Sequence, residues 1–124
     1  MITGFEEYTK ELSLYESSVL LPAILLGMEN KIGKSNAIKN CIAIKKMKEL
    51  GYKISDARFR KIMHIIRVSG MIKGIVATSD GYYIAHNSTD YAYYIKSLDE
   101  RIQHITNLRN ALQKQYLEYI NQIH

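Results

Sequence analysis

The sequence contains one cysteine, one proline and no long apolar run, and each shortage narrows the possible classes of protein. A lone cysteine, Cys41, cannot form an internal disulfide, so we expect a reducing, cytoplasmic setting. Its neighbours Ile38, Ile42 and Ile44 predict that the thiol is buried. The longest apolar stretch, Val19 to Leu26, is much shorter than the ~20 residues of a membrane span, and it follows an acidic segment rather than the basic start of a signal peptide. We therefore expect no membrane association.

The residue types that metal and catalytic sites need are present but not at the required spacing. The histidines are scattered along the chain, and none lies at ligand spacing from Cys41. Gly33, Lys34 and Ser35 are similar to the end of a phosphate-binding loop, but Met28 stands where that motif needs its first glycine. No Ser-His-Asp or paired-carboxylate arrangement is indicated. We therefore expect no metal, no cofactor and no enzymatic activity.

The charge of the chain is unevenly distributed. The whole sequence has a net charge of +5. Residues 31–73 contain twelve Lys and Arg against two acidic residues, a net charge of +10, whereas residues 1–30 carry −4 and residues 74–124 carry −1. A basic block between acidic flanks is typical of a surface that binds a polyanion, although a solvated lysine-rich face gives the same pattern.

Two helices are expected in the first half of the chain. Ser13 and Glu16 have capping-box spacing, which predicts a helix from Leu14 to about Met28 that is kinked or delayed by its internal proline. Ser35 is the expected N-cap of a second helix that ends near Leu50. The side chains that this helix offers to the core are Ile38, Cys41, Ile42 and Leu50.

A third helix and a hairpin follow. Ser55 is the expected N-cap of a helix that ends at Gly70, and a buried stripe is predicted at i, i+3, i+4, i+7 spacing, formed by Phe59, Ile62, Met63 and Ile66. Next come two segments rich in β-branched and aromatic residues, Ile72 to Thr78 and Tyr82 to Ala85. The Asp80-Gly81 pair between them predicts a hairpin turn.

The stretch YKISDARFRKIMHIIRVSGMIKGIVATSDGYYIA, residues 52–85, resembles winged-helix DNA-binding proteins, particularly short phage or prophage ones. A helical tail containing YYIKSLDERI extends the resemblance. The fold that it implies is mainly α with a small β-hairpin, a winged helix-turn-helix followed by a long C-terminal helix. We expect three regions: an N-terminal helical segment over residues 1–30 that packs on the core, a winged-helix region over 31–87 and a C-terminal helix over 88–124.

The resemblance implies that the helix from Ser55 to Ser69 enters the major groove of DNA. If its apolar stripe faces inward, Ala57, Lys61, His64 and Val68 face outward, with Arg58 and Arg60 beside them. Arg58 and Lys61 are expected to reach guanine edges or phosphates, whereas Arg60 and Arg67 suit an intramolecular partner or a phosphate. The residues that we expect to contact DNA are Lys34, Ser35, Asn36, Lys39, Ala57, Arg58, Arg60, Lys61, His64 and Lys73.

The tip of the hairpin departs from this family. Residues 78–81 include Asp80 and no cation, and Lys73 at the base is the only basic residue nearby. Whether this wing touches DNA stays open. Tyr82 and Tyr83 suit either a stacking surface for bases or a strand that is half core and half surface, and the second reading is the more ordinary one.

A long amphipathic pattern runs from Asp90 to the C-terminus. Apolar residues recur at alternating spacings of three and four, and only Arg109 interrupts them. Such a seam predicts a coiled-coil homodimer, although packing of the tail on its own domain, or a break near Leu98, stays open. The orientation of the two helices is not fixed by the pattern. The expected dimerisation residues are Ile95, Leu98, Ile102, Ile105, Arg109, Leu112, Tyr116 and Tyr119.

These observations favour a dimeric winged-helix protein that binds double-stranded DNA, in transcription regulation or in phage replication. The alternative is a protein–protein interaction module in which the winged helix and the tail are docking surfaces. The acidic wing tip and the apolar tail suit that alternative, and the basic block counts against it.

Overall fold

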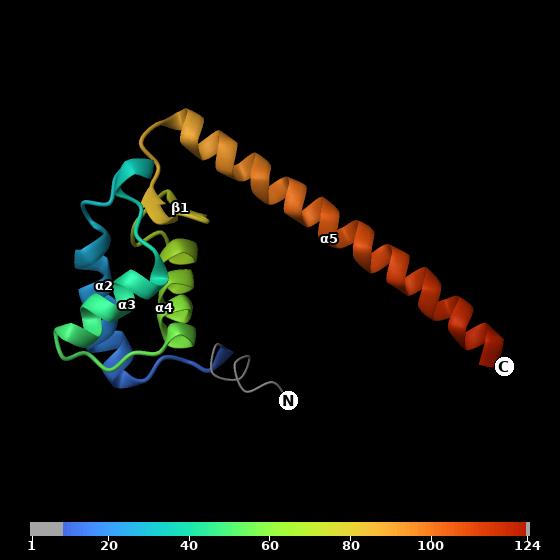
Figure 1. Ribbon diagram of the computed structural model, residues 1–124, viewed down its shortest axis with the longest axis horizontal. Helices are drawn as coiled ribbons and strands as arrows, with labels where there is room; N and C mark the ends of the chain where they lie inside the picture. Colours follow the sequence, from blue (N-terminus) through green and yellow to red (C-terminus); the bar gives the residue numbers. More distant parts are fainter. Residues whose placement is uncertain (1–8, 124) are drawn as a thin grey trace. The chain divides into compact units, whose positions relative to one another are not determined.

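A computed structural model describes residues 9–123 of the protein, most of which are helical (Figure 1). The chain divides between Asn87 and Ser88 into two units. The prediction of a mainly helical protein with a small hairpin and a long C-terminal helix is confirmed. In chain order the elements are η1 (Glu16–Leu20), α2 (Leu21–Met28), η2 (Lys34–Asn36), α3 (Asn40–Glu49), α4 (Asp56–Ser69), β1 (Ile75–Thr78), β2 (Gly81–Ile84) and α5 (Ser88–Ile123).

The first helical segment runs from Leu14 to Met28, as the sequence predicts. Its capping box is formed in both directions, because the Ser13 N–H donates to Oε1 of Glu16 at 2.8 Å and the Glu16 N–H donates to Oγ of Ser13 at 3.1 Å. Residues 16–20 form a π-helical turn, η1, just before Pro22. A proline has no N–H to donate and crowds the preceding turn, so the widened turn lets the helix continue past it.

The predicted start of the second helix at Ser35 is wrong. Ser35 lies in the short turn η2, and α3 begins only at Asn40. The reason is that Ile38 pairs with β2: its N–H donates to the Tyr82 carbonyl at 2.9 Å, and its carbonyl accepts from the Tyr82 N–H at 2.9 Å. These backbone groups are therefore committed to extended pairing, which excludes a helical conformation at this residue.

The core face of α3 also differs from the prediction. The side chains that it buries are Ile44 and Met47, whereas Cys41 is exposed and Leu50 is 77% exposed. The expectation of a buried thiol is therefore wrong. With the helix beginning at Asn40, Cys41 lies in its open first turn, and Ile42 faces away from the stripe formed by Ile44 and Met47.

The predictions for α4 are confirmed. Oγ of Ser55 accepts the Arg58 N–H at 3.2 Å as an N-cap, and Gly70 ends the helix in the left-handed conformation with φ 75°. The four predicted stripe residues are at most 2% exposed. They meet side chains from the first helical segment, α3 and β1 in one core, formed by Leu20, Ile24, Met28, Ile44, Met47, Ile54, Phe59, Ile62, Met63, Ile66 and Ile75.

The hairpin is formed at the predicted turn. Strands β1 and β2 pair antiparallel, with Ile75 opposite Ile84 and Thr78 opposite Gly81, so β1 is shorter than the predicted segment. Gly81 has φ 115°, and a Cβ atom there would lie 2.2 Å from the carbonyl oxygen of Ile38. Only glycine therefore allows the backbone of Ile38 to approach β2 this closely at residue 81.

The second unit is the single helix α5. It continues without interruption through Leu98, which resolves the question that the sequence leaves open. Ser97 and Glu100 have the capping-box spacing that suggests a break near Leu98, but the Ser97 hydroxyl donates to the carbonyl of Tyr94 at 2.7 Å and the residue stays inside the helix. None of the side chains described from residue 88 to residue 122 is buried.

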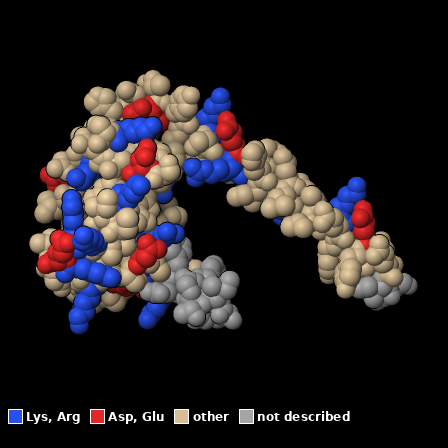
Figure 2. Space-filling view, viewed as in Figure 1, with Lys and Arg blue, Asp and Glu red and all other residues tan. Residues whose placement is uncertain are grey.

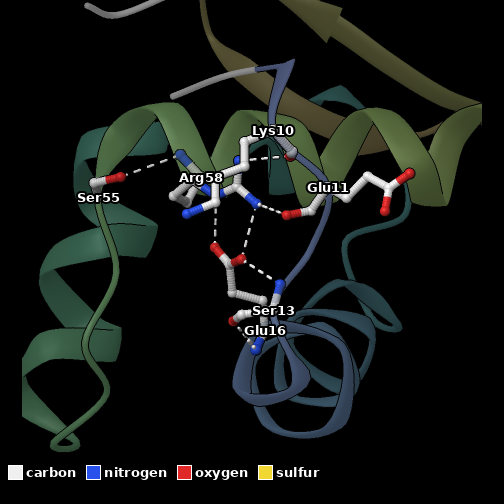
Figure 3. A network of polar contacts seen from close by, with 6 residues as sticks. All are labelled: Lys10, Glu11, Ser13, Glu16, Ser55 and Arg58. Atoms are coloured by element: carbon white, nitrogen blue, oxygen red, sulfur yellow. Dashed lines mark hydrogen bonds and ion pairs between the residues drawn. The ribbon is translucent and has the colours of Figure 1, made fainter. Parts of the chain in front are cut away.

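A polar network joins the start of the first helical segment to α4 (Figure 3). Nε and Nη2 of Arg58 donate to the two carboxylate oxygens of Glu16 at 2.6 and 2.8 Å, and both side chains are almost buried, at 11% and 12% exposure. Nη1 and Nη2 also donate to the carbonyl oxygens of Lys10 at 2.8 Å and Glu11 at 2.9 Å. The hydrogen bonds of Arg58 lower the pKa of Glu16 from 4.5 to about 2.

This network contradicts the prediction that Arg58 lies on the outer, DNA-facing side of α4. The guanidinium is turned toward residues 10–16 instead, where four hydrogen bonds hold it. A charge inside a protein is retained only when it is paired and hydrogen-bonded, and Glu16 and the two carbonyl groups satisfy that condition.

We expect Arg58→Ala to lower the free energy of unfolding by about 3 kcal/mol, because it leaves the Glu16 carboxylate nearly buried without its cation. Arg60→Ala is the matched control on the same helix. Its ion pair with Asp56 is more than half exposed, at 57% and 58%, so its loss should change the free energy by no more than about 0.5 kcal/mol. Urea denaturation measures both. Equal effects of the two substitutions would contradict the structural role of Arg58.

The same network predicts a pH dependence of stability. The folded-state pKa of Glu16 is about 2 against an ordinary 4.5, so its ionised form stabilises the protein above pH 4.5, and this contribution is lost as pH falls through 2. We expect the protein to be more stable than the Glu16→Gln variant at pH 7, by on the order of 3 kcal/mol. More than half of the difference should be gone at about pH 3, and the rest should be lost as pH falls through 2, measured by urea denaturation. A constant difference across this range would show that ionised Glu16 does not stabilise the fold.

Candidate functional site

The outward side of α4 borders an open depression of about 520 Å³, here named the α4 groove. Three of its lining residues, Ala57, Arg60 and His64, are among those that the sequence selects for DNA contact. The complete lining is Asn40, Asp56, Ala57, Arg60, His64, Arg67 and Tyr82. The groove thus combines one face of α4 with the first residue of α3 and with β2.

Both arginines of the α4 groove have partners within the protein, as the sequence suggested for residues near the edge of the buried stripe. Nε of Arg60 lies 2.9 Å from Oδ2 of Asp56, one turn earlier on the helix. The guanidinium carbon of Arg67 lies 5.8 Å from the ring centroid of Tyr82. The exposed pair of Arg60 contributes little to stability, so this side chain can exchange its partner at small cost. The ring of Tyr82 orients Arg67 without neutralising its charge.

Tyr82 connects the hairpin with α4 and with the segment that precedes α3. Its backbone pairs with Ile38 on one edge of β2 and with Ala77 on the other. Its ring is 6.4 Å from the ring of Phe59, a core residue of α4, and it also lies under Arg67. The side chain that the sequence assigned to ordinary packing is therefore the contact that fixes the hairpin against the groove.

The other candidates lie outside the groove. Lys34, Ser35 and Asn36 are exposed and form η2 rather than the start of a long helix, with Nδ2 of Asn36 donating to the Ile32 carbonyl at 2.8 Å. Lys39 is exposed and occupies the N-cap position of α3. It therefore immediately precedes Asn40, which lines the groove.

Two further candidates on α4 and the hairpin also lie outside the groove. Lys61 is half-buried on α4. Lys73 is exposed in the turn that precedes β1. At the hairpin tip Asp80 is exposed, and its N–H donates to Oγ1 of Thr78 at 3.2 Å. The tip therefore presents a carboxylate to solvent.

Charge on the first unit is mixed rather than of one sign. Figure 2 shows Lys and Arg over much of the visible face of this unit, with Asp and Glu among them. The lysines of α3 after its first turn, Lys45, Lys46 and Lys48, are all exposed. The α4 groove is mixed in the same way, because its lining includes two arginines and one aspartate, with an excess of one positive charge.

A larger depression, of about 880 Å³, surrounds the Arg58 network. Its lining includes Lys10, Glu11, Ser13, Glu16 and Arg58, whose polar groups bond to one another. The guanidinium, which is the natural anchor for an anionic ligand, is occupied by the Glu16 carboxylate. Size alone therefore does not make this depression the functional site.

The described residues contain neither a metal-binding cluster nor a helix that could span a membrane. Over residues 9–123 there is no cluster of three or more His, Cys, Asp or Glu side chains that could hold a metal ion. Across the same span, α5 is long enough to cross a membrane but is too polar to do so, and the other helices are shorter.

Sequence reasoning missed Asn40 and Tyr82 as members of the site. With Ser35 as the expected N-cap, Asn40 falls inside the helix, so the sequence does not indicate its position at the helix N-terminus. For Tyr82 the sequence allows a stacking surface but favours ordinary packing, because its place in the groove depends on pairing with Ile38, which is far away in the sequence.

Comparison of the chain with known proteins finds no match to a family model, to a curated protein or to a solved structure.

Proposed function

We propose that the unit of residues 9–87 is a winged helix that binds double-stranded DNA, with α4 as the helix that enters the major groove. The observation that carries the proposal is the α4 groove, in which the exposed Arg60 and His64 and the half-buried Arg67 lie on one face of the helix with Ala57. Guanidinium groups pair with guanine edges and phosphates, and a small residue allows the helix to approach the bases closely.

The arrangement of elements supports a winged helix. A helix over residues 14–28 is followed by a segment that pairs through Ile38 with β2, then by α3, a short turn, α4 and the hairpin. Two helices joined by a short turn, the second with an exposed polar face, form the helix-turn-helix unit, and the hairpin stands in the place of the wing.

Each cation has a distinct role in this proposal. Arg67, oriented by Tyr82, and Arg60, released from its exposed pair with Asp56, contact bases or phosphates. Lys39 and the η2 residues contact the phosphate backbone, beside the N-terminus of α3. Arg58 is excluded from the interface because Glu16 holds it. The acidic wing tip stays out of the minor groove, where phosphates would repel Asp80.

The long-range charge of the unit adds affinity that does not depend on DNA sequence. Residues 31–73 carry a net charge of +10. The positive electrostatic potential of these residues attracts a polyanion before any specific contact forms. Transcription regulation and DNA replication both use such a module, and the proposal covers either role.

Protein docking is the second candidate function, and one observation favours it. Leu26 and Leu50 are exposed at 71% and 77%, and both line a depression of about 420 Å³ together with Ala23, Met47 and Tyr52. Exposed leucines beside such a depression are typical of a surface that binds an apolar side chain. This surface lies on α2 and α3 and shares no lining residue with the α4 groove.

We expect the protein to bind random-sequence duplex DNA, measured by fluorescence anisotropy, with an affinity that falls as salt is raised from about 50 to 200 mM. Arg60→Ala with Arg67→Ala should weaken binding at least about tenfold and reduce the salt slope by roughly 2 if both side chains contact phosphates. The matched control is Lys45→Ala with Lys48→Ala, which removes the same charge from the exposed side of α3 and should have a much smaller effect.

Thermal melting of each variant checks that the fold is retained. Equal losses for the two double variants would show that α4 is not the reading element. Absence of binding at about 50 mM salt would overturn the DNA proposal and favour protein docking.

A further inference from the structure

Helix α5 carries an apolar stripe that no part of its own unit covers. The helix spans 36 residues, and its seam residues Ile95, Ile102, Ile105 and Leu112 are 54–68% exposed. Tyr116 and Tyr119 are 60% and 61% exposed. An isolated helix gains little stability from its own hydrogen bonds, and most helical stability in proteins comes from packing of the apolar face. A stripe of this length therefore requires a partner.

The eight seam positions can all be paired when two copies of the helix run antiparallel. Its eight positions, which alternate spacings of three and four, are arranged evenly about residue 107. Each position lies as far before residue 107 as another lies after it. The four pairs related in this way are Ile95 with Tyr119, Leu98 with Tyr116, Ile102 with Leu112 and Ile105 with Arg109.

We infer that α5 pairs with α5 of a second copy of this chain in an antiparallel two-stranded coiled coil centred near residue 107. In this register each seam residue faces the residue related to it by the symmetry. Large side chains then meet smaller ones in three of the four kinds of layer: each tyrosine meets an aliphatic residue, and Arg109 meets Ile105 of the partner subunit. In the fourth kind of layer Ile102 meets Leu112 of the partner subunit, which is of equal size. Layers of similar total volume pack without voids or strain.

The parallel register is much less favourable. It places Arg109 against Arg109 of the partner subunit, so two like charges share one layer of the seam. It also stacks Tyr116 and Tyr119 on their own copies near the C-terminal end, while the earlier layers contain only Ile and Leu. The layers would then differ strongly in side-chain volume along the coil. Both the layers of paired tyrosines and the layers of paired aliphatic residues would pack less well.

Leu108 supports the antiparallel register independently. It is 62% exposed and lies just outside the seam, beside Arg109. Flanking residues of this type meet their own copies in an antiparallel pair, and because Leu108 lies next to the centre of symmetry, the two Leu108 side chains would touch. In the parallel register Leu108 lies near Gln113 of the partner subunit. Its apolar surface would then be covered by a polar amide.

The charges of α5 agree with the antiparallel register. Residues 88–105 contain three acidic and two basic residues, a net charge of −1, whereas residues 106–124 contain one acidic and two basic residues, a net charge of +1. Figure 2 shows the charged side chains of this helix in two separate groups. An antiparallel pair brings opposite net charges together at both ends and also opposes the two helix dipoles.

The buried area is sufficient for a stable dimer. A Leu- or Ile-sized side chain that gains roughly 1.5 kcal/mol on burial removes about 60 Å² from water. Eight seam residues on each of two helices therefore bury about 1,000 Å², to which the Leu108 pair adds. Specific interfaces generally exceed about 1,000 Å².

The antiparallel pairing determines where two DNA-binding units of a dimer would lie, and this consequence rests on the proposed function. The pairing itself does not depend on that function. At ~1.5 Å per residue, the two N-terminal ends of α5 would lie about 57 Å apart along the coil, and each continues from a unit of residues 9–87. This separation exceeds the ~34–36 Å between half-sites one helical turn apart. The dimer would therefore hold its two DNA-binding units at opposite ends of the coil.

Disulfide trapping in the full-length chain tests the register. In a Cys41→Ser background, Ile102→Cys and Leu112→Cys are prepared separately, then mixed under reducing conditions and oxidised. The antiparallel register brings residue 102 opposite residue 112 of the partner subunit, whereas two copies of residue 102 lie about 15 Å apart along the axis, too far for a disulfide. We therefore expect a crosslinked dimer in the mixture and little in either variant alone. Crosslinking of each variant with itself would establish the parallel register and overturn the inference.

A charge substitution gives a second test that does not depend on crosslinking. Ile105→Glu places a carboxylate opposite Arg109 of the partner subunit and should retain the dimer. Ile102→Glu, its matched control, places the carboxylate opposite Leu112 of the partner subunit and should weaken dimerisation at least about tenfold. Sedimentation equilibrium measures both and also tests the stoichiometry of the unmodified protein. A monomer of 14.3 kDa, a trimer or a tetramer, or equal weakening by the two substitutions, would overturn the inference. DNA binding by a monomer would leave the proposed function intact.

Discussion

A nearly buried carboxylate and guanidinium join the first helical turn of the described chain to α4. Glu16 is in phase with Leu20, Ile24 and Met28 at intervals of four residues, so it faces the same core as those apolar side chains. An ionised group in that position needs a cation, and Arg58 supplies it. The pair lies beside the apolar stripe of α4 and acts with it to hold that side of the helix inward, which leaves Arg60, His64 and Arg67 at the α4 groove.

The features that could be predicted from the sequence are those with local causes. The capping residues Ser13 and Ser55, the apolar stripe of α4 and the Asp80-Gly81 turn each act within a few residues, and the structure confirms them. The start of α3 could not be predicted in this way. Ile38 is extended because its backbone pairs with Tyr82, so a distant strand overrides the local signal of Ser35.

The candidate site was predicted only in part for the same reason. Helical geometry places Ala57, Lys61, His64 and Val68 on the outer face, with Arg58 and Arg60 beside them. Of these six residues, Ala57, Arg60 and His64 line the α4 groove, whereas Lys61 is half-buried outside it. Arg58 was assigned to that face because its partner is not local: Glu16 lies 42 residues earlier and had been read only as part of a capping box. Glu16 has two roles. Its carboxylate accepts the Ser13 N–H as part of the capping box, and it also accepts hydrogen bonds from Arg58. An acidic residue in phase with a buried stripe was the available signal for the second partner.

The central claim is that α4 and the turn before α3 form the surface that meets duplex DNA. Amide chemical shifts of the isotope-labelled full-length protein, recorded while a short random-sequence duplex is added, test this claim residue by residue. We predict that the largest shift changes occur in residues 56–67 and 34–40, with little change in the Leu26–Leu50 depression or in α5. Changes concentrated in that depression or in α5, with α4 unaffected, would contradict the claim.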